Sequence, residues 1–341
     1  MFDTICICGG GSLGHVLAGY LAWKGKRVFM LTNKPSRWQK EITVYTCDNK
    51  ILTGCLEFIT DKPEDVISLA DTVLLCLPGF LIHDELLKIK PYLKPSTYVG
   101  SVVSSTGFFF EALQHLSQNQ PLWGFQRVPF ICRTENYGAS ANLLGYKSDF
   151  HIAIEHTPTE QKEQFAQQIA DIFKTPTHLL KNHWEASLTN SNPILHTARL
   201  YSMFSSWKPD TRAQHNILFY EEWTDEASEL LIQMDCEFFK VLNVLPVSKG
   251  FLPTLLEHYG CNDKQSLTNK LRNIESFKGI PSPMKKVDNG WIPDFNNRYF
   301  KEDFPYGLRF IWELANIHHI NATTINKVYS WGADKLGINI G

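Results

Sequence analysis

The chain has 341 residues, 43% of them hydrophobic, and a formal net charge of −2 at pH 7. This length suits two domains, and the apolar fraction excludes a disordered chain. The near-neutral charge argues against a global electrostatic attraction to nucleic acid or to an anionic membrane, although it leaves room for a local basic patch. The small net charge therefore predicts no nucleic-acid partner. No apolar segment is long enough to cross a bilayer, so we also expect no membrane span.

Eight cysteines are spread along the chain without a C-x-x-C pair. Several lie in apolar, strand-like segments, where a thiol packs as a small hydrophobic group. No charged segment with a long apolar run behind it precedes the first expected strand, so we expect no secretory signal. These features predict a cytoplasmic protein with reduced thiols and argue against a metal site.

The first half of the chain alternates strand-like and helix-like segments, which is typical of parallel α/β architecture. Strands are expected at residues 4–8, 27–31, 72–77 and 97–103, a hairpin at 42–46 and 51–58, and a mostly extended segment at 145–155. Helices are expected at residues 12–24, 63–69, 81–89, 108–116 and 159–173.

Helical patterns dominate beyond a change of composition near residue 180, and clear strand patterns are absent there. The expected helices are residues 184–204, 221–242, 252–259, 306–317 and 323–336. We therefore predict an α/β fold in which a Rossmann-type parallel-sheet domain, residues 1–180, binds a dinucleotide. A mainly helical C-terminal domain, residues 181–341, would bind substrate and carry the catalytic groups.

The first expected strand runs directly into Gly9-x-Gly11-x-x-Gly14, which opens a helix. Gly9 permits the tight turn, Gly11 lets the backbone approach a pyrophosphate, and Gly14 lets the helix pack closely on the strand. The helix start at Ser12 and Leu13 offers free N–H groups and a positive dipole end to phosphate. A turn that binds nothing is the alternative, but the surrounding strand–helix–strand order favours a dinucleotide site.

The residues after the second strand bear on the choice between NAD and NADP. An acidic residue there would bond the ribose 2′-hydroxyl, but this chain has Thr32-Asn33-Lys34, with Arg37 following. Asn33, Lys34 and Arg37 are therefore candidate cofactor contacts, and the two cations could pair with a 2′-phosphate. Both could instead be solvated loop charges. NADP(H) is favoured, and NAD(H) stays open.

Two further loops follow expected strands, Leu77-Pro78-Gly79 and Ser104-Ser105-Thr106-Gly107. The carboxyl ends of parallel strands lie beside the cofactor crevice of such folds. Pro78 is therefore a candidate cofactor contact and Thr106 a candidate substrate contact. Their position alone supports these roles, and both loops could simply end their strands.

His196 stands out among the twelve histidines because of its setting, Asn192-Pro193-Ile-Leu-His196. Asn192 and His196 are four residues apart and share a helix face, and Pro193 kinks or starts the helix. Polar groups at a helix irregularity favour a site. The alternative is a structural histidine whose hydrogen bonds are satisfied.

Residues 297–308 are dense in charged and aromatic side chains and precede a helix. Asp303 could orient an imidazole and stabilise its charged form. Its position, with Pro305 in the first turn that follows, better fits a charge at a helix N-terminus.

The chain resembles the opine dehydrogenase family, which includes octopine and nopaline dehydrogenases. The glycine loop agrees, and Val128-Pro-Phe-Ile-Cys-Arg133 with Tyr137-Gly138 is similar to a family segment L-P-Y-x-C-R followed by Y-G. The most specific match is residues 298–308, which resemble the family signature R-Y-x-x-E-D-x-P-Y-G-L nearly throughout. The order of domains also agrees, so the resemblance covers most of the chain.

This resemblance implies a catalytic His/Asp pair, which His196 and Asp303 fit. It also implies a reaction in which the amine of an amino acid condenses with a 2-keto acid and NAD(P)H reduces the resulting imine. His196 would then handle protons while Asp303 fixes its tautomer. Asn192 would hold a substrate oxygen, and Arg298 would clamp a carboxylate through its planar fork unless it forms a salt bridge instead.

Two other functions stay open. A ketopantoate reductase-like enzyme or a 2-hydroxyacid reductase would reduce a ketone without an amine. A non-catalytic protein that senses NADP would need no His/Asp pair. The expected partners are a small-molecule amino acid and a 2-keto acid, and the sequence is compatible with a homodimer.

Overall fold

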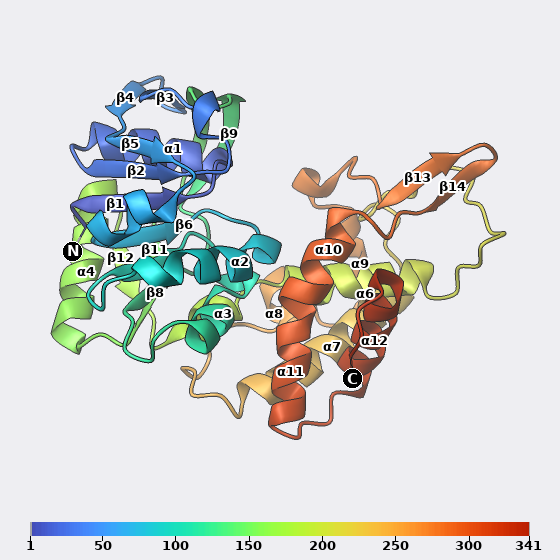
Figure 1. Ribbon diagram of the computed structural model, residues 1–341. Coiled ribbons are helices and arrows are strands. Elements are labelled where there is room, and N and C mark those ends of the chain that lie inside the picture. The colour runs from blue at the N-terminus through green and yellow to red at the C-terminus, as the bar shows by residue number, and fades with distance from the viewer. Residues whose placement is uncertain (1, 341) are drawn as a thin grey trace. The chain divides into compact units, whose positions relative to one another are not determined.

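The computed structural model describes residues 2–340. The chain divides into two units, Met1–Thr189 and Asn190–Gly341, and each is described by itself. The first unit carries the sheets drawn from blue to green in Figure 1, and the second is mostly helix.

An eight-stranded sheet forms the centre of the first unit, in the order β12-β11-β8-β7-β6-β1-β2-β5. The strands from β5 to β8 pair in parallel, in the strand order of a Rossmann fold, while β11 runs antiparallel to β8. The predicted parallel α/β domain is thus confirmed. The bounds are β1 Thr4–Cys8, β2 Arg27–Leu31, β5 Phe58–Thr60, β6 Thr72–Leu75, β7 Tyr98–Ser101, β8 Leu122–Phe125, β11 Phe150–Glu155 and β12 Thr177–Leu179.

Both faces of this sheet are covered, which explains why its central strands are continuous apolar runs. On β1, Ile5 and Ile7 face one core with α1 (Ser12–Trp23) and α4 (Thr159–Phe173). Cys6 and Cys8 alternate with them and face the other core, with α2 (Gly79–Ile89) and α3 (Phe108–His115). The two thiols are fully buried and free, as expected for small hydrophobic groups.

A second, four-stranded sheet packs against α1, in the order β4-β3-β10-β9. Its strands are β3 Glu41–Thr46, β4 Ile51–Cys55, β9 Phe130–Asn136 and β10 Ser140–Tyr146. The predicted hairpin forms β3 and β4. Its parallel pairing with β10 was not predictable locally, because the two hairpins are far apart in sequence.

Several local predictions for the first unit need correction. Residues 63–69 form two single 3-10 turns, Pro63–Asp65 and Ile67–Leu69, instead of an α-helix. The extended segment at 145–155 is divided between β10 and β11. The predicted helix at 184–204 is interrupted, because α5 (His183–Ser187) ends before α6 (Asn192–Phe204) begins.

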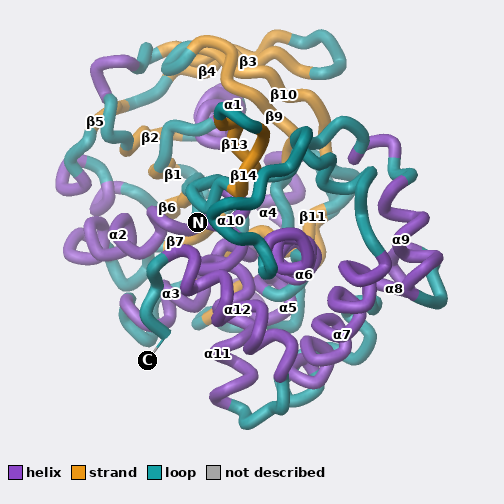
Figure 2. Tube along the Cα trace, turned by 90° about the vertical axis from the view of Figure 1, so that its right-hand side faces the viewer, coloured by secondary structure: helices purple, strands orange, loops and turns teal. Residues whose placement is uncertain are grey.

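The second unit is mainly helical, as predicted, and its helices appear in purple in Figure 2. They are α6, α7 Asp225–Leu242, α8 Leu255–Tyr259, α9 Lys264–Arg272, α10 Arg298–Asp303, α11 Arg309–Ile317 and α12 Thr323–Leu336. The expected absence of strands is wrong, since β13 (Met284–Val287) and β14 (Gly290–Pro293) form a hairpin. The hairpin is short and carries exposed lysines, so it lacks the alternating apolar pattern that identifies a half-buried strand.

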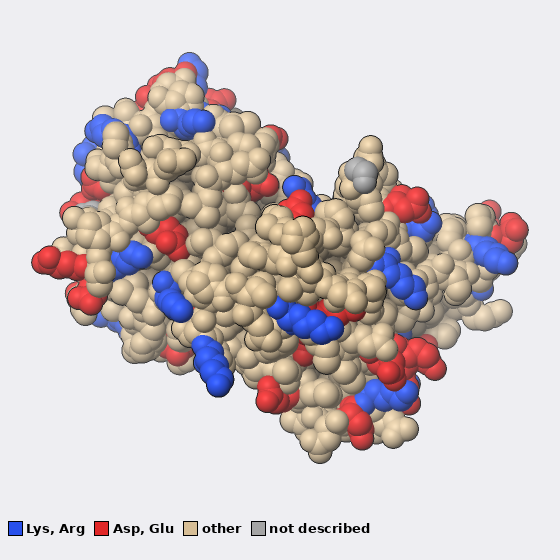
Figure 3. All heavy atoms as spheres, turned by 90° about the horizontal axis from the view of Figure 1, so that it is seen from below, with Lys and Arg blue, Asp and Glu red and all other residues tan. Residues whose placement is uncertain are grey.

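Within residues 2–340, no helix combines the length and the apolar character needed to cross a membrane. On the face shown in Figure 3, basic and acidic side chains are interspersed. This mixed surface agrees with the small net charge of −2.

Candidate active site

The glycine loop joins β1 to α1 with a geometry that larger residues could not adopt. Gly9 has a φ of 114°, and a Cβ there would lie 2.6 Å from the carbonyl oxygen of Cys76. A Cβ on Gly14 would overlap the carbonyl oxygen of Gly9. No protein atom lies within 4 Å of a Cβ built on Gly11, so that part of the loop is open to a ligand. These are the properties expected of a pyrophosphate-binding turn.

A buried histidine that the sequence analysis overlooked fixes this loop. His15 Nδ1 lies 2.9 Å from the carbonyl oxygen of Gly11, and its Nε2 accepts from the backbone N–H of Gly138 at 2.7 Å. This pattern requires a neutral ring with the proton on Nδ1, and burial lowers the pKa of His15 in the same direction. The ring also stacks on Trp38, with centroids 4.2 Å apart. The turn that contains Tyr137 and Gly138 is thereby attached to the glycine loop.

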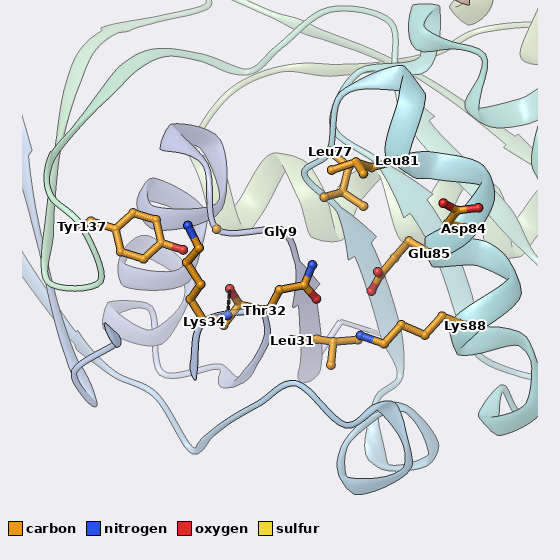
Figure 4. A pocket seen from close by; sticks show the side chains of 12 residues that line it. Gly9, Leu31, Thr32, Lys34, Leu77, Leu81, Asp84, Glu85, Lys88 and Tyr137 are labelled. Atoms are coloured by element: carbon orange, nitrogen blue, oxygen red, sulfur yellow. Dashed lines mark hydrogen bonds between the residues drawn. The ribbon is translucent and has the colours of Figure 1, made fainter. Parts of the chain in front are cut away.

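A hollow of about 420 Å³ adjoins the glycine loop. The end of β2 and the first turns of α2 supply opposite walls, and Tyr137 lies on the side of Lys34 (Figure 4). The lining residues are Gly9, Gly10, Leu31, Thr32, Asn33, Lys34, Leu77, Leu81, Asp84, Glu85, Lys88 and Tyr137. In Rossmann folds the space after the second strand takes the adenosine half of a dinucleotide. This hollow follows β2 and is therefore the candidate adenosine site, called the adenosine hollow below.

The charges in this hollow are more mixed than the sequence indicated. No carboxylate follows β2, as predicted, but α2 brings Asp84 and Glu85 to the same hollow together with Lys88. Burial raises the pKa of Glu85, and the charge of Lys88 opposes this effect. Two cations, Lys34 and Lys88, therefore share the hollow with two carboxyl groups.

Seven other predicted contacts lie outside the lining of this hollow: Gly11, Ser12, Leu13, Gly14, Arg37, Pro78 and Thr106. The hydroxyl of Ser12 accepts from the backbone N–H of Thr134 at 2.9 Å. The guanidinium of Arg37 lies over the Tyr137 ring, 4.6 Å from its centroid. The hydroxyl of Thr106 donates to a carbonyl of its own turn, and Pro78 is the residue before α2.

The second unit brings His196 and Asp303 together. His196 Nδ1 lies 2.8 Å from a carboxylate oxygen of Asp303, and the two side chains are only 10% and 17% exposed. Asp303 does precede a helical turn, Phe304–Leu308, with Pro305 in its first turn, as its position indicated. Its side chain makes no cap hydrogen bond there and bonds His196 instead. A carboxylate at this distance accepts from Nδ1–H and so leaves Nε2 as the basic nitrogen of a neutral ring.

Nε2 of His196 also has a partner, the hydroxyl of Tyr220 at 3.0 Å. Burial raises the pKa of Tyr220 far above its ordinary value, so the phenol keeps its proton and donates it. Arg199, one turn after His196, donates to the carbonyls of Phe219 and Glu222 and thereby holds the loop that carries Tyr220. Burial lowers the pKa of Arg199 to about 10.

A hollow of about 270 Å³ opens beside His196. It is lined by Asn192, His196, Arg298, Tyr299, Glu302 and Asp303. Asn192 therefore shares the hollow with His196, as their spacing predicted. Arg298 lines it too, but its guanidinium pairs with Glu302 at 2.8 Å and its side chain is 77% exposed. The hydrogen bond to Glu302 raises the pKa of Arg298.

Two local irregularities determine how the ends of α6 and α10 approach each other. Pro193 lies in the first turn of α6, so it starts the helix and does not kink it. After Asp303, residues Phe304–Leu308 form a π-helical turn that contains Pro305, a feature that is frequent at functional sites. Gly307 in this turn lies against Pro193, where a Cβ would come within 2.7 Å of the proline Cγ. This close contact sets the distance between the helix ends that carry His196 and Asp303.

Comparison with known families identifies two blocks of the chain. Residues 179–336 match the model of the NAD/NADP octopine/nopaline dehydrogenase alpha-helical domain. This part of the chain belongs to the family of octopine and nopaline dehydrogenases. Residues 5–125 match the ketopantoate reductase PanE/ApbA model, so the match to that family's model lies in the parallel-sheet domain.

Known relatives support this assignment along the whole chain. Octopine dehydrogenase from Pecten maximus is 27% identical over 99% of this chain and 91% of its own length. A structure of octopine dehydrogenase with NADH and L-arginine covers 98% of this chain and 89% of that chain, with 24% identity and a TM-score of 0.84. NADP⁺-bound yersinopine dehydrogenase covers 98% and 91%, with 13% identity and a TM-score of 0.70.

The match of the helical domain and the full-length relatives define the reaction class. The protein is an NAD(P)-dependent oxidoreductase that reductively condenses an amino acid with a 2-keto acid. The family model spans both His196 and Asp303.

Replacing Gly307 with Ala tests the contact between the π-helical turn and α6. The new Cβ would force Pro193 to move, and such overpacking destabilises by about 1–3 kcal/mol. Because small displacements of catalytic groups can lower rates about a hundredfold, we expect at least a tenfold loss of turnover. Denaturant unfolding and NAD(P)H oxidation measure the two effects.

Gly145→Ala is the matched control, because the nearest atom to its Cβ is at an ordinary 3.6 Å. It should stay close to wild type in both measurements. A Gly307→Ala variant with unchanged stability and turnover would show that this contact does not position the site.

Proposed function

We propose that His196 is the proton-transfer group of this opine dehydrogenase and that Asp303 fixes its tautomer. The observation that carries the proposal is the buried 2.8 Å bond between His196 Nδ1 and Asp303, beside a polar hollow. An imidazole held in this way can accept a proton from the substrate and later return it. His196 would take a proton from the amino-acid amine and later return one to the hydroxyl that leaves as water. Bound NAD(P)H would supply the hydride that reduces the imine.

The charges around the hollow suit a small zwitterion. Arg298 offers a guanidinium whose planar fork matches a carboxylate, and its partner Glu302 offers an anion for an ammonium group. The pair would open to take one end of the amino acid on each charge. Asn192 lies one helical turn before His196 and would hold a substrate oxygen.

In this proposal, Tyr220 acts in the free enzyme, before substrate binds. Its hydroxyl occupies Nε2 of His196, although Tyr220 does not line the hollow. Since Nδ1 is held by Asp303, the substrate must reach Nε2 and displace the phenol before His196 can act. Tyr220 is therefore a positioning residue that keeps Nε2 satisfied in the free enzyme.

Replacing His196 with Ala should lower turnover about 100-fold or more, the usual contribution of a general acid–base group. The assay follows NADPH and NADH oxidation with pyruvate and a panel of amino acids. Oxidation must require the amine, which separates condensation from simple ketone reduction. Asp303→Asn should show a similar loss, because the amide no longer holds the required tautomer.

The matched control is His183→Ala, which removes a similarly buried pair, since His183 lies 2.9 Å from Glu155. It should retain turnover per folded molecule. If His196→Ala turned over at the wild-type rate, His196 would have no part in the mechanism.

Tyr220→Phe separates the positioning role from a direct one. We expect kcat within about fivefold of wild type and an equal or lower KM for the amino acid, because no hydroxyl has to be displaced. Loss of the donor to a buried nitrogen should lower the free energy of unfolding by about 1–3 kcal/mol. A kcat reduced 100-fold would instead mean that the phenol itself passes protons to the substrate.

For the cofactor, we propose a preference for NADP(H) in which Lys34 pairs with the 2′-phosphate. Lys34 follows β2 and lines the hollow, where the ribose of a Rossmann-bound dinucleotide lies. Asp84 and Glu85 line the hollow from α2. Burial raises the pKa of Glu85, and Lys88 adds a second cation to the same wall of the hollow.

Lys34→Gln should weaken NADPH binding about tenfold or more, since a hydrogen bond to a charged group contributes about 1.5–3 kcal/mol. NADH binding should change less than twofold. Fluorescence titration with each nucleotide measures both, and exposed Lys40 outside the hollow supplies the control, Lys40→Gln. Equal weakening of both nucleotides, or of neither, would exclude Lys34 as the phosphate partner.

A further inference from the structure

Two histidines and a glutamate meet between α2 and α3, apart from both hollows. His83 Nδ1 lies 3.0 Å from Glu111 Oε2, and His115 Nε2 lies 3.3 Å from the same oxygen. One ligand atom from each residue lies within 4.8 Å of the others. The two imidazole rings are nearly perpendicular, with centroids 4.6 Å apart.

We propose that His83, Glu111 and His115 bind a zinc ion. Bonds of about 2.0–2.1 Å in a tetrahedral site place neighbouring ligand atoms about 3.3–3.4 Å apart. Two of the three separations, 3.0 and 3.3 Å, are already close to this value. The remaining separation can close by a small rotation of the His83 side chain, which is 45% exposed.

The set of donors favours zinc over harder cations. Two imidazole nitrogens and one carboxylate oxygen are a known zinc-binding combination that leaves a fourth position for water. Magnesium and calcium prefer oxygen ligands throughout. The partial exposure of the cluster allows an ion and a water molecule to enter.

The backbone places the three donors without needing the metal. Glu111 and His115 are four residues apart on α3 and therefore share a face. His115 is the last residue of α3, where the helix dipole favours a cation. His83 comes from the middle of α2, which packs against α3. A bound ion would therefore tie the two helices together.

The site lies on the helix that forms a wall of the adenosine hollow, but on another face. Leu81, Asp84, Glu85 and Lys88 line the hollow, whereas His83 contacts Glu111 of α3. Zinc would therefore stabilise the first unit without occupying the position of the dinucleotide. This inference does not depend on the roles proposed for His196 and Lys34.

Calorimetric titration of the EDTA-treated, dialysed full chain with Zn²⁺ tests the site. We expect one saturable ion per chain, a higher melting temperature with zinc, and no binding of Mg²⁺. His83→Gln and His115→Gln should lose this ion, and Glu111→Gln should bind it at least tenfold more weakly. Binding should also weaken on acidification, because protonated imidazole cannot coordinate.

The matched control is His215→Gln, which removes an exposed histidine paired with a single carboxylate, Glu222, at 3.0 Å. It should keep the ion. Cys47, Cys55 and Cys236 are exposed thiols, so Co²⁺ is titrated as well. A thiolate-to-cobalt charge-transfer band, undiminished binding in both His83→Gln and His115→Gln, or no saturable zinc binding would each overturn the proposal.

Discussion

The hydrogen bond between His196 and Asp303 joins two helix ends that are 107 residues apart in sequence. A separation of 2.8 Å leaves little tolerance in the backbones that carry the pair. The first turn of α6 and the π-helical turn after α10 must therefore meet at a fixed distance. Gly307 and Pro193 provide that distance, because the missing Cβ lets one turn lie directly on the ring of the other.

Burial also makes any unpaired polar atom in this arrangement costly in free energy. A buried carboxylate or imidazole that loses its partner costs several kcal/mol, so each polar atom of the pair needs a donor or an acceptor. Tyr220 satisfies Nε2, and Arg199 holds the loop that carries Tyr220 through two backbone carbonyls. Arg199 lies on the same helix as His196. One helix thus carries both the His196 ring and the side chain that holds the loop of its partner, Tyr220.

The sequence predicted those parts of the molecule that depend on local rules. The glycine loop needs only a strand, a tight turn and a helix, and all of these are adjacent in the chain. Asn192 and His196 share a face because they are four residues apart, and Pro193 starts their helix as one of the two predicted alternatives. The role of Asp303 needed the family signature, since its position alone pointed to a helix N-terminus.

The parts that were missed depend on contacts between distant segments. Tyr220 lies in an irregular loop with no periodicity, and nothing near it in the sequence indicates a histidine partner. His15 has its partner in a turn between β9 and β10, strands whose sheet also requires a remote hairpin. Asp84 and Glu85 reach the hollow because α2 follows β6, the strand beside β1, and not because they follow β2. Only the order of strands in the sheet shows that these residues lie near the position expected for the ribose of a bound dinucleotide.

Helix α2 shows how one short element can serve three purposes at once. Ile82, Leu86 and Ile89 are buried in the core under the sheet. Asp84, Glu85 and Lys88 turn to the adenosine hollow, and His83 reaches Glu111 on α3. Residues on different faces of one helix do not contact each other, but they move together because the buried face is rigidly packed. A change on the α3 side can therefore affect the hollow only by displacing the whole helix, which the packed core resists. The residues on each face of α2 can consequently differ in chemistry without displacing the residues on the other faces.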